Sequence, residues 1–132
     1  MRLMQLIYVS RPFGFDNPIL NGILATARHN NKRDGITGAL VCRSDLYLQL
    51  LEGPRDKVTA AFARILHDDR HLDVTLIRSG DLEVRMFPDW LMRDDPARSW
   101  MWTQSEVASG AIETASMDDV RGVFERLLRE PE

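Results

Sequence analysis

Apolar residues follow two different spacings along the first third of the chain. Residues 3–10 are almost continuously apolar, which is typical of a central strand covered on both faces. Asp16 or Asn17 followed by Pro18 marks a helix start, because proline is preset for the first helical position. We expect this helix to end near Asn31, with five apolar side chains on one face at helical spacing: Ile19, Leu20, Ile23, Leu24 and Ala27.

A hairpin and a second helix are predicted next. Residues 35–42 and 46–52 are apolar segments separated by the polar triplet 43–45, which suits a tight turn. Gly53 and Pro54 end the second strand and open a helix. The apolar stripe expected on that helix comprises Val58, Ala61, Phe62, Ile65 and Leu66.

Two more strands and an amphipathic tail complete the expected elements. The strands are predicted over residues 74–78 and 84–92. Ser116 with Asp119 three residues later is typical of a helix N-terminus. The tail helix that follows would bury Val120, Val123, Phe124, Leu127 and Leu128.

The order strand, helix, strand, strand, helix, strand, strand predicts an α+β fold. Joining the first two strands through a helix places them parallel, with a right-handed crossover. We therefore expect a ferredoxin-like sandwich, with a mixed five-stranded sheet and two helices on one face. The tail helix would cover the other face of the sheet.

Composition and charge narrow the function classes. A chain of 132 residues fits one domain. Cys42 is the single cysteine and cannot form an internal disulfide, so a reducing cytoplasm is the expected compartment. The first ten residues do not resemble a signal peptide, and no apolar run is long enough to cross a membrane. A net charge of −3 argues against a nucleic-acid binder, although residues 28–33 are basic.

Buried polar side chains are the strongest hint of a site. Along residues 46–52, Gln49 shares a face with Tyr47 and Leu51, so its amide is expected to be buried and to need partners. Tyr8 lies inside the first apolar strand, and its hydroxyl makes the same demand. Taken alone, each residue is explained by a simple bond to the other or to the backbone.

Polar residues at two helix ends are further candidates. Asn31 continues the apolar face of the first helix, although asparagine at a helix end is usually a cap. Arg64 and Asp68 are four residues apart, and the default interpretation is an exposed ion pair.

The combination of these residues closely resembles the BLUF family of blue-light receptors that use FAD. The resemblance runs over residues 3–92 and includes the segments 36–38 and 87–92. The family's signature of an aromatic residue, a glutamine and Leu-Glu-Gly stands here as residues 47–53, with Tyr47 where phenylalanine is commoner. We expect residues 1–95 to form the flavin-binding domain and residues 96–132 a helical extension.

The resemblance implies a site for FAD between the two helices. The implied cofactor-binding positions are Ile23, Asn30, Asn31, Gln49, Arg64, Asp68 and Arg70, with Arg70 near the phosphates. The implied photoactive positions are Tyr8, Gln49, Trp90 and Met92, either of the last two lying beside the glutamine.

The implied function is light sensing without substrate turnover. Light would drive an electron and a proton from Tyr8, and the amide of Gln49 would be left rotated or tautomerised. About 40 residues follow Met92, so we expect the signal to pass to a separate partner protein. The tail, with Trp100, Met101 and Trp102 at its start, is expected to be either the output surface or only a cover for the sheet. A homo-oligomer is a further expectation.

Four other interpretations compete. Cys42 is preceded by Val41 rather than asparagine, which argues against a flavin–cysteine adduct sensor. His67 and His71 have a metal-chelating spacing but no third ligand, so a capping or solvent role is expected. An acylphosphatase-like hydrolase would need a phosphate loop, and residues 11–15 hold only one glycine. A metabolite-binding regulatory module stays open, although it would be colourless.

Overall fold

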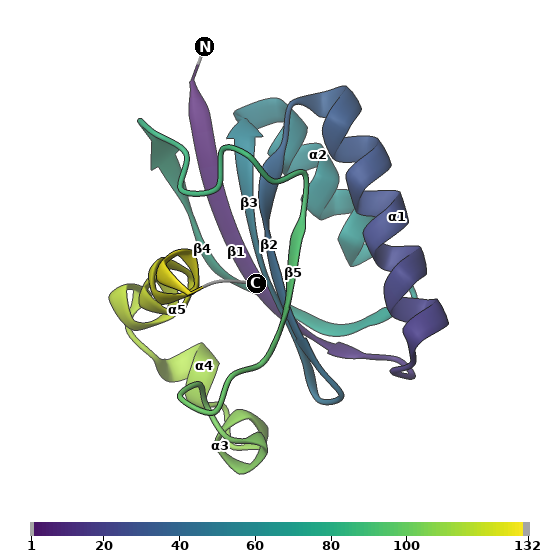
Figure 1. The fold of residues 1–132 in the computed structure, drawn as a ribbon, viewed down its shortest axis with the longest axis vertical. Helices are drawn as coiled ribbons and strands as arrows, with labels where there is room; N and C mark the ends of the chain where they lie inside the picture. The colour runs from purple at the N-terminus through teal and green to yellow at the C-terminus, as the bar shows by residue number, and fades with distance from the viewer. Residues whose placement is uncertain (1, 131–132) are drawn as a thin grey trace.

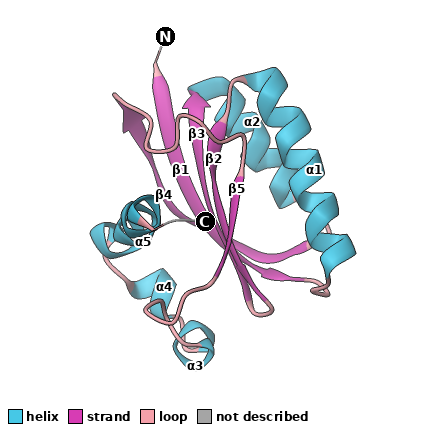
Figure 2. Ribbon diagram, viewed as in Figure 1, coloured by secondary structure: helices cyan, strands magenta, loops and turns pink. Residues whose placement is uncertain are grey.

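The elements follow the order that the apolar pattern predicts, with a tail of three helices (Figures 1 and 2). The computed structural model describes residues 2–130. The elements are β1 (Leu3–Pro12), α1 (Asn17–Asp34), β2 (Thr37–Arg43), β3 (Leu46–Pro54), α2 (Arg55–Leu66), β4 (His71–Leu82), β5 (Arg93–Pro96), α3 (Gln104–Ala108), α4 (Ala111–Thr114) and α5 (Met117–Arg129).

The sheet has the strand order β4-β1-β3-β2-β5. β3 lies between β1 and β2 and is antiparallel to both, so β1 and β2 are parallel, as predicted. β4 is antiparallel to β1 at one edge, and β5 is parallel to β2 at the other. The predicted ferredoxin-like α+β fold is confirmed.

Each face of the sheet is covered by different helices. α1 and α2 lie together on one face, and α5 lies on the opposite face (Figure 2). β3 contributes Tyr47 and Leu51 to the cluster under α1 and α2. It contributes Leu46, Leu48 and Leu50 to the cluster under α5, which is the predicted alternation.

α1 begins and ends at residues suited to those positions. The Asp16 side chain accepts a hydrogen bond from the backbone N–H of Ile19 at 2.8 Å. Gly35 closes the helix with φ of 70°, a conformation that glycine adopts readily, so the helix runs three residues beyond the predicted Asn31.

The predicted fifth strand over residues 84–92 is wrong. This segment is a loop, and the strand is the four-residue β5 that follows it. Pro88 cannot donate a ladder hydrogen bond, which disfavours a strand here. The apolar pattern arises because the loop inserts Phe87 into the cluster under α5 and Met92 into the cluster under α1 and α2.

Two leucines assigned to buried stripes are exposed. Leu66 is 52% exposed because it is the last residue of α2, and Leu128 is 42% exposed on the outer flank of α5. β4 is also longer at both ends than the predicted 74–78.

The tail docks on the sheet as predicted. Val120, Val123, Phe124 and Leu127 of α5 are buried against apolar side chains of the sheet. The proposed division near residue 95 stays a prediction, and its outermost residues, 1 and 131–132, lie outside the described residues.

Candidate functional site

The centre of the site is a buried pair on neighbouring strands. Tyr8 of β1 and Gln49 of β3 are direct partners in the antiparallel register. Their side chains are 0% and 3% exposed, and the Tyr8 hydroxyl donates a hydrogen bond to Oε1 of Gln49. Burial raises the pKa of Tyr8 far above its usual value, and the Asp68 carboxylate adds to this. Tyr8 therefore holds its proton at neutral pH and presents it to the amide oxygen.

The other end of the Gln49 amide meets a sulfur atom. Nε2 of Gln49 donates to Sδ of Met92 at 3.3 Å, and Met92 is buried. Within residues 2–130 this thioether is the one hydrogen-bond acceptor of Nε2, and thioethers are weak acceptors. An amide nitrogen has two N–H donors, so Gln49 keeps donor capacity for a further partner.

Of the two candidates Trp90 and Met92, the structure brings Met92 to the glutamine. Trp90 is 39% exposed in the loop before β5. Its backbone carbonyl accepts the N–H of Gly38, and its ring lies 6.0 Å from the guanidinium carbon of Arg93. Trp90 is thus outside the Tyr8–Gln49 contact.

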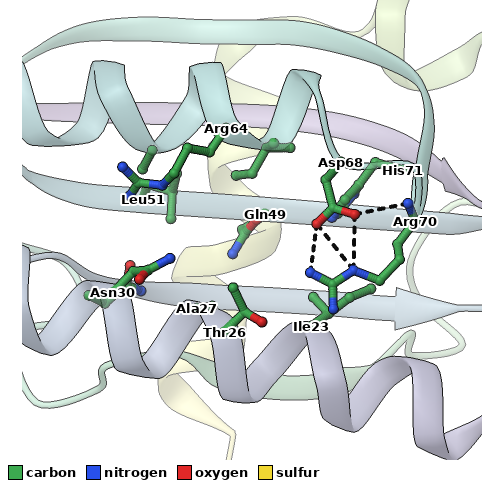
Figure 3. A pocket seen from close by; sticks show the side chains of 13 residues that line it. Ile23, Thr26, Ala27, Asn30, Gln49, Leu51, Arg64, Asp68, Arg70 and His71 are labelled. Carbon is green, nitrogen blue, oxygen red and sulfur yellow. Dashed lines mark hydrogen bonds and ion pairs between the residues drawn. The ribbon is translucent and has the colours of Figure 1, made fainter.

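A cleft opens beside Gln49 between α1 and α2 (Figure 3). It is open to solvent on one side, and its space for water-sized atoms is about 100 Å³. All seven residues predicted to bind a cofactor line it: Ile23, Asn30, Asn31, Gln49, Arg64, Asp68 and Arg70.

Asn31 is buried at the end of α1 that lies close to the 83–92 loop. Its Nδ2 donates to the backbone carbonyl of Leu91 at 2.6 Å, and the side chain is 3% exposed. Asn30 also lines the cleft and is half-buried. Two neighbouring amides therefore lie on the α1 side of the cleft, with a third, Gln49, on the sheet.

The ion pairs differ from the expected Arg64–Asp68 pair. α2 ends at Leu66, so Asp68 has left the helix and is not one turn from Arg64. Arg64 instead lies 3.3 Å from Asp34. Asp68 pairs with Arg70 at 2.7 Å, which lowers the pKa of the Asp68 carboxyl (Figure 3).

Arg70 closes part of the mouth of the cleft. A Cβ atom built on Gly22 of α1 would lie 3.4 Å from Nη1 of Arg70. The guanidinium thus reaches across from the α2–β4 connection to α1. Arg70 therefore lines the cleft with its charge paired to the carboxylate of Asp68.

Sequence reasoning assigned His71 a wrong role and missed Thr26. His71 is buried at the start of β4, where Nδ1 lies 2.8 Å from Oγ of Ser10, so it has neither a capping nor a solvent role. Burial lowers the pKa of His71 to about 4, which keeps its imidazole neutral. Thr26 lines the cleft one turn before Asn30, and this helical spacing could have identified it.

Glu52 holds the 83–92 loop against the sheet. This fully buried carboxylate accepts the backbone N–H groups of Met86 at 3.0 Å and Phe87 at 2.8 Å. It also accepts Nε2 of Gln5 at 3.0 Å. Glu52 therefore fixes the loop that brings Leu91 to Asn31 and Met92 to Gln49.

No group of three histidine, cysteine, aspartate or glutamate side chains that could hold a metal ion occurs within residues 2–130. No helix in that same stretch has the length and apolarity to span a membrane. Cys42 is buried, and burial raises the pKa of its thiol to about 11.

The donor set of the cleft fits a flavin ring. Such a ring has flat apolar faces and one edge of carbonyl and N–H groups. Ile23, Ala27 and Ile65 offer apolar contacts, and the three amides offer both donors and acceptors. Gln49, whose Nε2 can donate one more hydrogen bond, is part of this same lining.

Comparison with known proteins decides the family. Residues 3–93 match the family described as BLUF, sensors of blue light using FAD. The chain belongs to this family. As BLUF proteins are blue-light sensors that bind flavin, the hydrolase and metabolite-binding alternatives are set aside.

Relatives and solved structures agree with the assignment. The BLUF chain is 39% identical over 74 residues to photoactivated adenylate cyclase subunit beta of Euglena gracilis, covering 55% of this chain and 9% of that protein. It thus spans about a tenth of the length of such curated relatives. The dark-state structure of BlrB, a BLUF protein, superposes with a TM-score of 0.76 at 27% identity, covering 96% of this chain and 95% of that one.

A bacterial light-regulated adenylyl cyclase superposes with a TM-score of 0.69 at 28% identity. That match covers 94% of this chain but 36% of the cyclase. The BLUF fold therefore occurs both in a chain of this size and as part of a longer enzyme.

Proposed function

We propose that this chain senses blue light with FAD held in the cleft between α1 and α2, and that Tyr8 and Gln49 are its photoactive pair. The observation that carries the proposal is the buried hydrogen bond from the Tyr8 hydroxyl to Oε1 of Gln49, on the wall of that cleft. A neutral, desolvated phenol is an electron and proton donor, and an amide can relay a proton and change its orientation.

Seven residues would hold the cofactor. Asn31, with Asn30 and Gln49, would bond the polar edge of the ring, and Ile23 would pack on its face. Arg64 and Asp68 would contact the far edge and the ribityl chain. Arg70 would face the phosphates, which suits a cation at the mouth of the cleft.

When bound and excited by blue light, the flavin supplies a strong one-electron oxidant. Tyr8 would release an electron and pass its phenolic proton to Gln49, and its hydrogen bond to Oε1 of Gln49 supports this role. Both return to Tyr8 when the charges recombine, so the chain is neither oxidised nor covalently changed. What persists is the rotated or tautomerised amide of Gln49, and the chain turns over no substrate.

Rotation of the amide has a direct consequence at Met92. The amide nitrogen would then face Tyr8 and the carbonyl oxygen would face Sδ of Met92. A thioether accepts a hydrogen bond but cannot donate one, so the N–H···S contact would be lost. Met92 directly precedes β5, which is therefore the first element expected to respond.

An ionic network supports a route from β5 to the tail. Arg93 and Asp95 of β5 form a buried ion pair at 2.8 Å. Arg98 lies 3.3 Å from Asp95 and 3.5 Å from Glu130, just beyond α5. Nη2 of Arg93 also donates to the backbone carbonyl of Glu130 at 3.1 Å. We propose that displacement of β5 alters the docking of α5 and so a surface for a separate partner protein.

The first experiment is an absorption spectrum before and after blue light. The purified chain should carry a flavin that shifts modestly to the red and recovers in darkness. Release of the flavin by denaturation, followed by chromatography, distinguishes FAD from FMN. A chain that shows no reversible shift after reconstitution with FAD would refute the proposal.

The route to the tail is tested separately by hydrogen exchange in dark and light. Protection of residues 100–128 should change with illumination, and Asp95→Asn should reduce that change while leaving the red shift intact. Equal protection in both states of the wild type, with an intact photocycle, would mean that the tail only covers the sheet.

A further inference from the structure

Met92 is held at its side chain and at its backbone. Its Sδ accepts Nε2 of Gln49, and its backbone carbonyl accepts two hydrogen bonds from Arg28 of α1. Nε of Arg28 lies 3.2 Å from the carbonyl oxygen, and Nη2 lies 2.9 Å from it. The N–H donors of a guanidinium form a rigid fork, so two bonds to one oxygen restrict the direction of the Met92 carbonyl as well as its distance from α1.

Arg28 is separate from the cofactor cleft. Arg28 is not among the residues that line the cleft, whereas Asn31 of the same helix lines it and donates to the carbonyl of Leu91. Residues three apart lie on the same side of a helix, so α1 binds the two successive carbonyls of Leu91 and Met92. Of these two contacts, the one from Arg28 can be removed without changing the lining of the cleft.

Asp94 of β5 binds the same guanidinium. Nη2 of Arg28 lies 2.9 Å from Oδ1 of Asp94, and the two side chains are 42% and 47% exposed. An ion pair with this exposure contributes little to stability. The hydrogen bonds from Arg28 to the Met92 carbonyl are partly buried, so water competes less with them. Substitution of Asp94 can therefore distinguish the ion pair from the carbonyl contact.

We propose that Arg28 is a positioning residue for the light reaction: it holds the carbonyl of Met92 and thereby keeps the Met92 thioether beside Nε2 of Gln49. This inference rests on the proposed photoactive role of Gln49. The thioether can accept a hydrogen bond from the amide only when the amide nitrogen faces it. A fixed Met92 therefore stabilises the dark orientation of the amide, and a displaced Met92 stabilises neither orientation.

NMR of isotope-labelled methionine methyl groups reports the environment of Met92 in darkness. The Met92 resonance is identified by its loss in Met92→Leu. In Arg28→Ala this resonance should move toward the value of a mobile methionine, because the Met92 carbonyl has lost two donors. Arg28→Lys should restore part of the wild-type position, since lysine keeps a charged donor. Alanine is a good helix former and Arg28 is half-exposed, so Arg28→Ala should remain folded.

Two control variants accompany this measurement. Lys32→Ala removes one cation from an exposed position one turn further along α1. Asp94→Asn removes the ion pair and leaves the hydrogen bonds to the Met92 carbonyl. Neither should move the Met92 resonance. The proposal is overturned if the resonance keeps its wild-type position in Arg28→Ala, or if Asp94→Asn moves it as far as Arg28→Ala does. Because the measurement needs neither light nor flavin, failure of the proposed function would show in the photocycle and not here.

The rate of dark recovery tests whether Arg28 acts through the thioether. Arg28→Ala should retain flavin and the red shift but slow recovery by about two- to tenfold, because Met92 stabilises the dark orientation less. Met92→Leu has no acceptor for Nε2 and should also slow recovery. Adding Arg28→Ala to Met92→Leu should then have no further effect, a result that general destabilisation would not give. Effects that multiply in the double variant, or recovery of Arg28→Ala at the wild-type rate or faster, would overturn the proposal.

Discussion

The two faces of the sheet bury very different side chains. The face under α5 has an apolar cluster, with Ile7, Val41, Leu48 and Phe124 among its members. The polar side chains buried beside that cluster, such as Glu52 and the Arg93–Asp95 ion pair, are held by partners within the chain. The face under α1 and α2 buries Tyr8 and Gln49 within an otherwise apolar cluster. Because β1 and β3 supply both faces, alternate residues of the same strands serve stability on one side and chemistry on the other.

This difference between the two faces shows where buried side chains can rearrange without loss of packing. Shortening any one side chain of a close-packed apolar cluster lowers the stability of the folded protein. A buried amide held by a phenol and a thioether can exchange its two ends without changing its volume. The polar face is thus the one that can have two arrangements of the same atoms.

The largest expected effect on stability is on the apolar face. Phe124 is fully buried and packs edge-on against Phe87, with ring centroids 6.3 Å apart. Phe124→Ala should lower the free energy of unfolding by about 3–5 kcal/mol, measured by denaturant titration. Gln49→Leu should cost less, about 1–3 kcal/mol, since it mainly leaves the Tyr8 hydroxyl without its acceptor. If Gln49→Leu lowered the free energy of unfolding more than Phe124→Ala does, the apolar face would not be the more important one for stability.

Between about pH 4 and 6.5, a pH dependence of stability should come from His71 on the polar face. The pKa of His71 is about 4 in the folded chain and 6.5 for an unperturbed histidine. Between these values the unfolded chain takes up a proton that the folded chain does not, so stability falls as the pH is lowered through this window. The slope from His71 is at most about 1.4 kcal/mol per pH unit.

Denaturant titrations across that pH range measure the slope. His71→Phe should flatten it, because phenylalanine keeps a ring beside Tyr8 and Tyr47 but cannot take up a proton. The exposed His67 is the control, and His67→Gln should leave the slope as it is. If the unfolding free energy of His71→Phe changed with pH as steeply as that of the wild type, groups other than His71 would cause the pH dependence.

The smallest effect on stability is expected at the cleft's rim. Asp34 is held by Arg33 at 2.8 Å as well as by Arg64, whose side chain is 44% exposed. Arg64→Ala should therefore change the free energy of unfolding by under about 1 kcal/mol. It should nevertheless reduce flavin retention during gel filtration, because Arg64 lines the cleft. Arg33→Ala removes the other partner of Asp34 outside the cleft, and equal flavin loss in both variants would contradict a cofactor role for Arg64.

The sequence predicted those features that depend on regular spacing. Alternation in residues 46–52 placed Gln49 on the face of Tyr47 and Leu51, and helical spacing placed Asn31 in line with Ile23. Features of the turns and loops between elements could not be predicted from regular spacing. Asp68 leaves α2 and binds Arg70, and the 83–92 loop has an apolar pattern because it serves both faces.

His71 shows a second limit of sequence reasoning. α2 ends at Leu66 and β4 begins at His71. His71 is therefore a strand residue whose buried ring contacts Ser10, and not a residue of the helix end. Trp90 and Met92 are separated for a similar reason, because β5 begins only after Met92. Register at such junctions is fixed by tertiary contacts such as those of Glu52.

The central claim is that Tyr8 and Gln49 form the photoactive pair. The most direct test is the light-minus-dark absorption spectrum of three flavin-loaded variants: Tyr8→Phe, Gln49→Leu and Tyr47→Phe. Tyr47 lies on the same face two residues before Gln49, and its buried hydroxyl has no hydrogen-bond partner within the described residues. Tyr8→Phe and Gln49→Leu should retain flavin and lose the reversible red shift, whereas Tyr47→Phe should keep it. A normal red shift in Gln49→Leu, or its loss in Tyr47→Phe alone, would contradict the account.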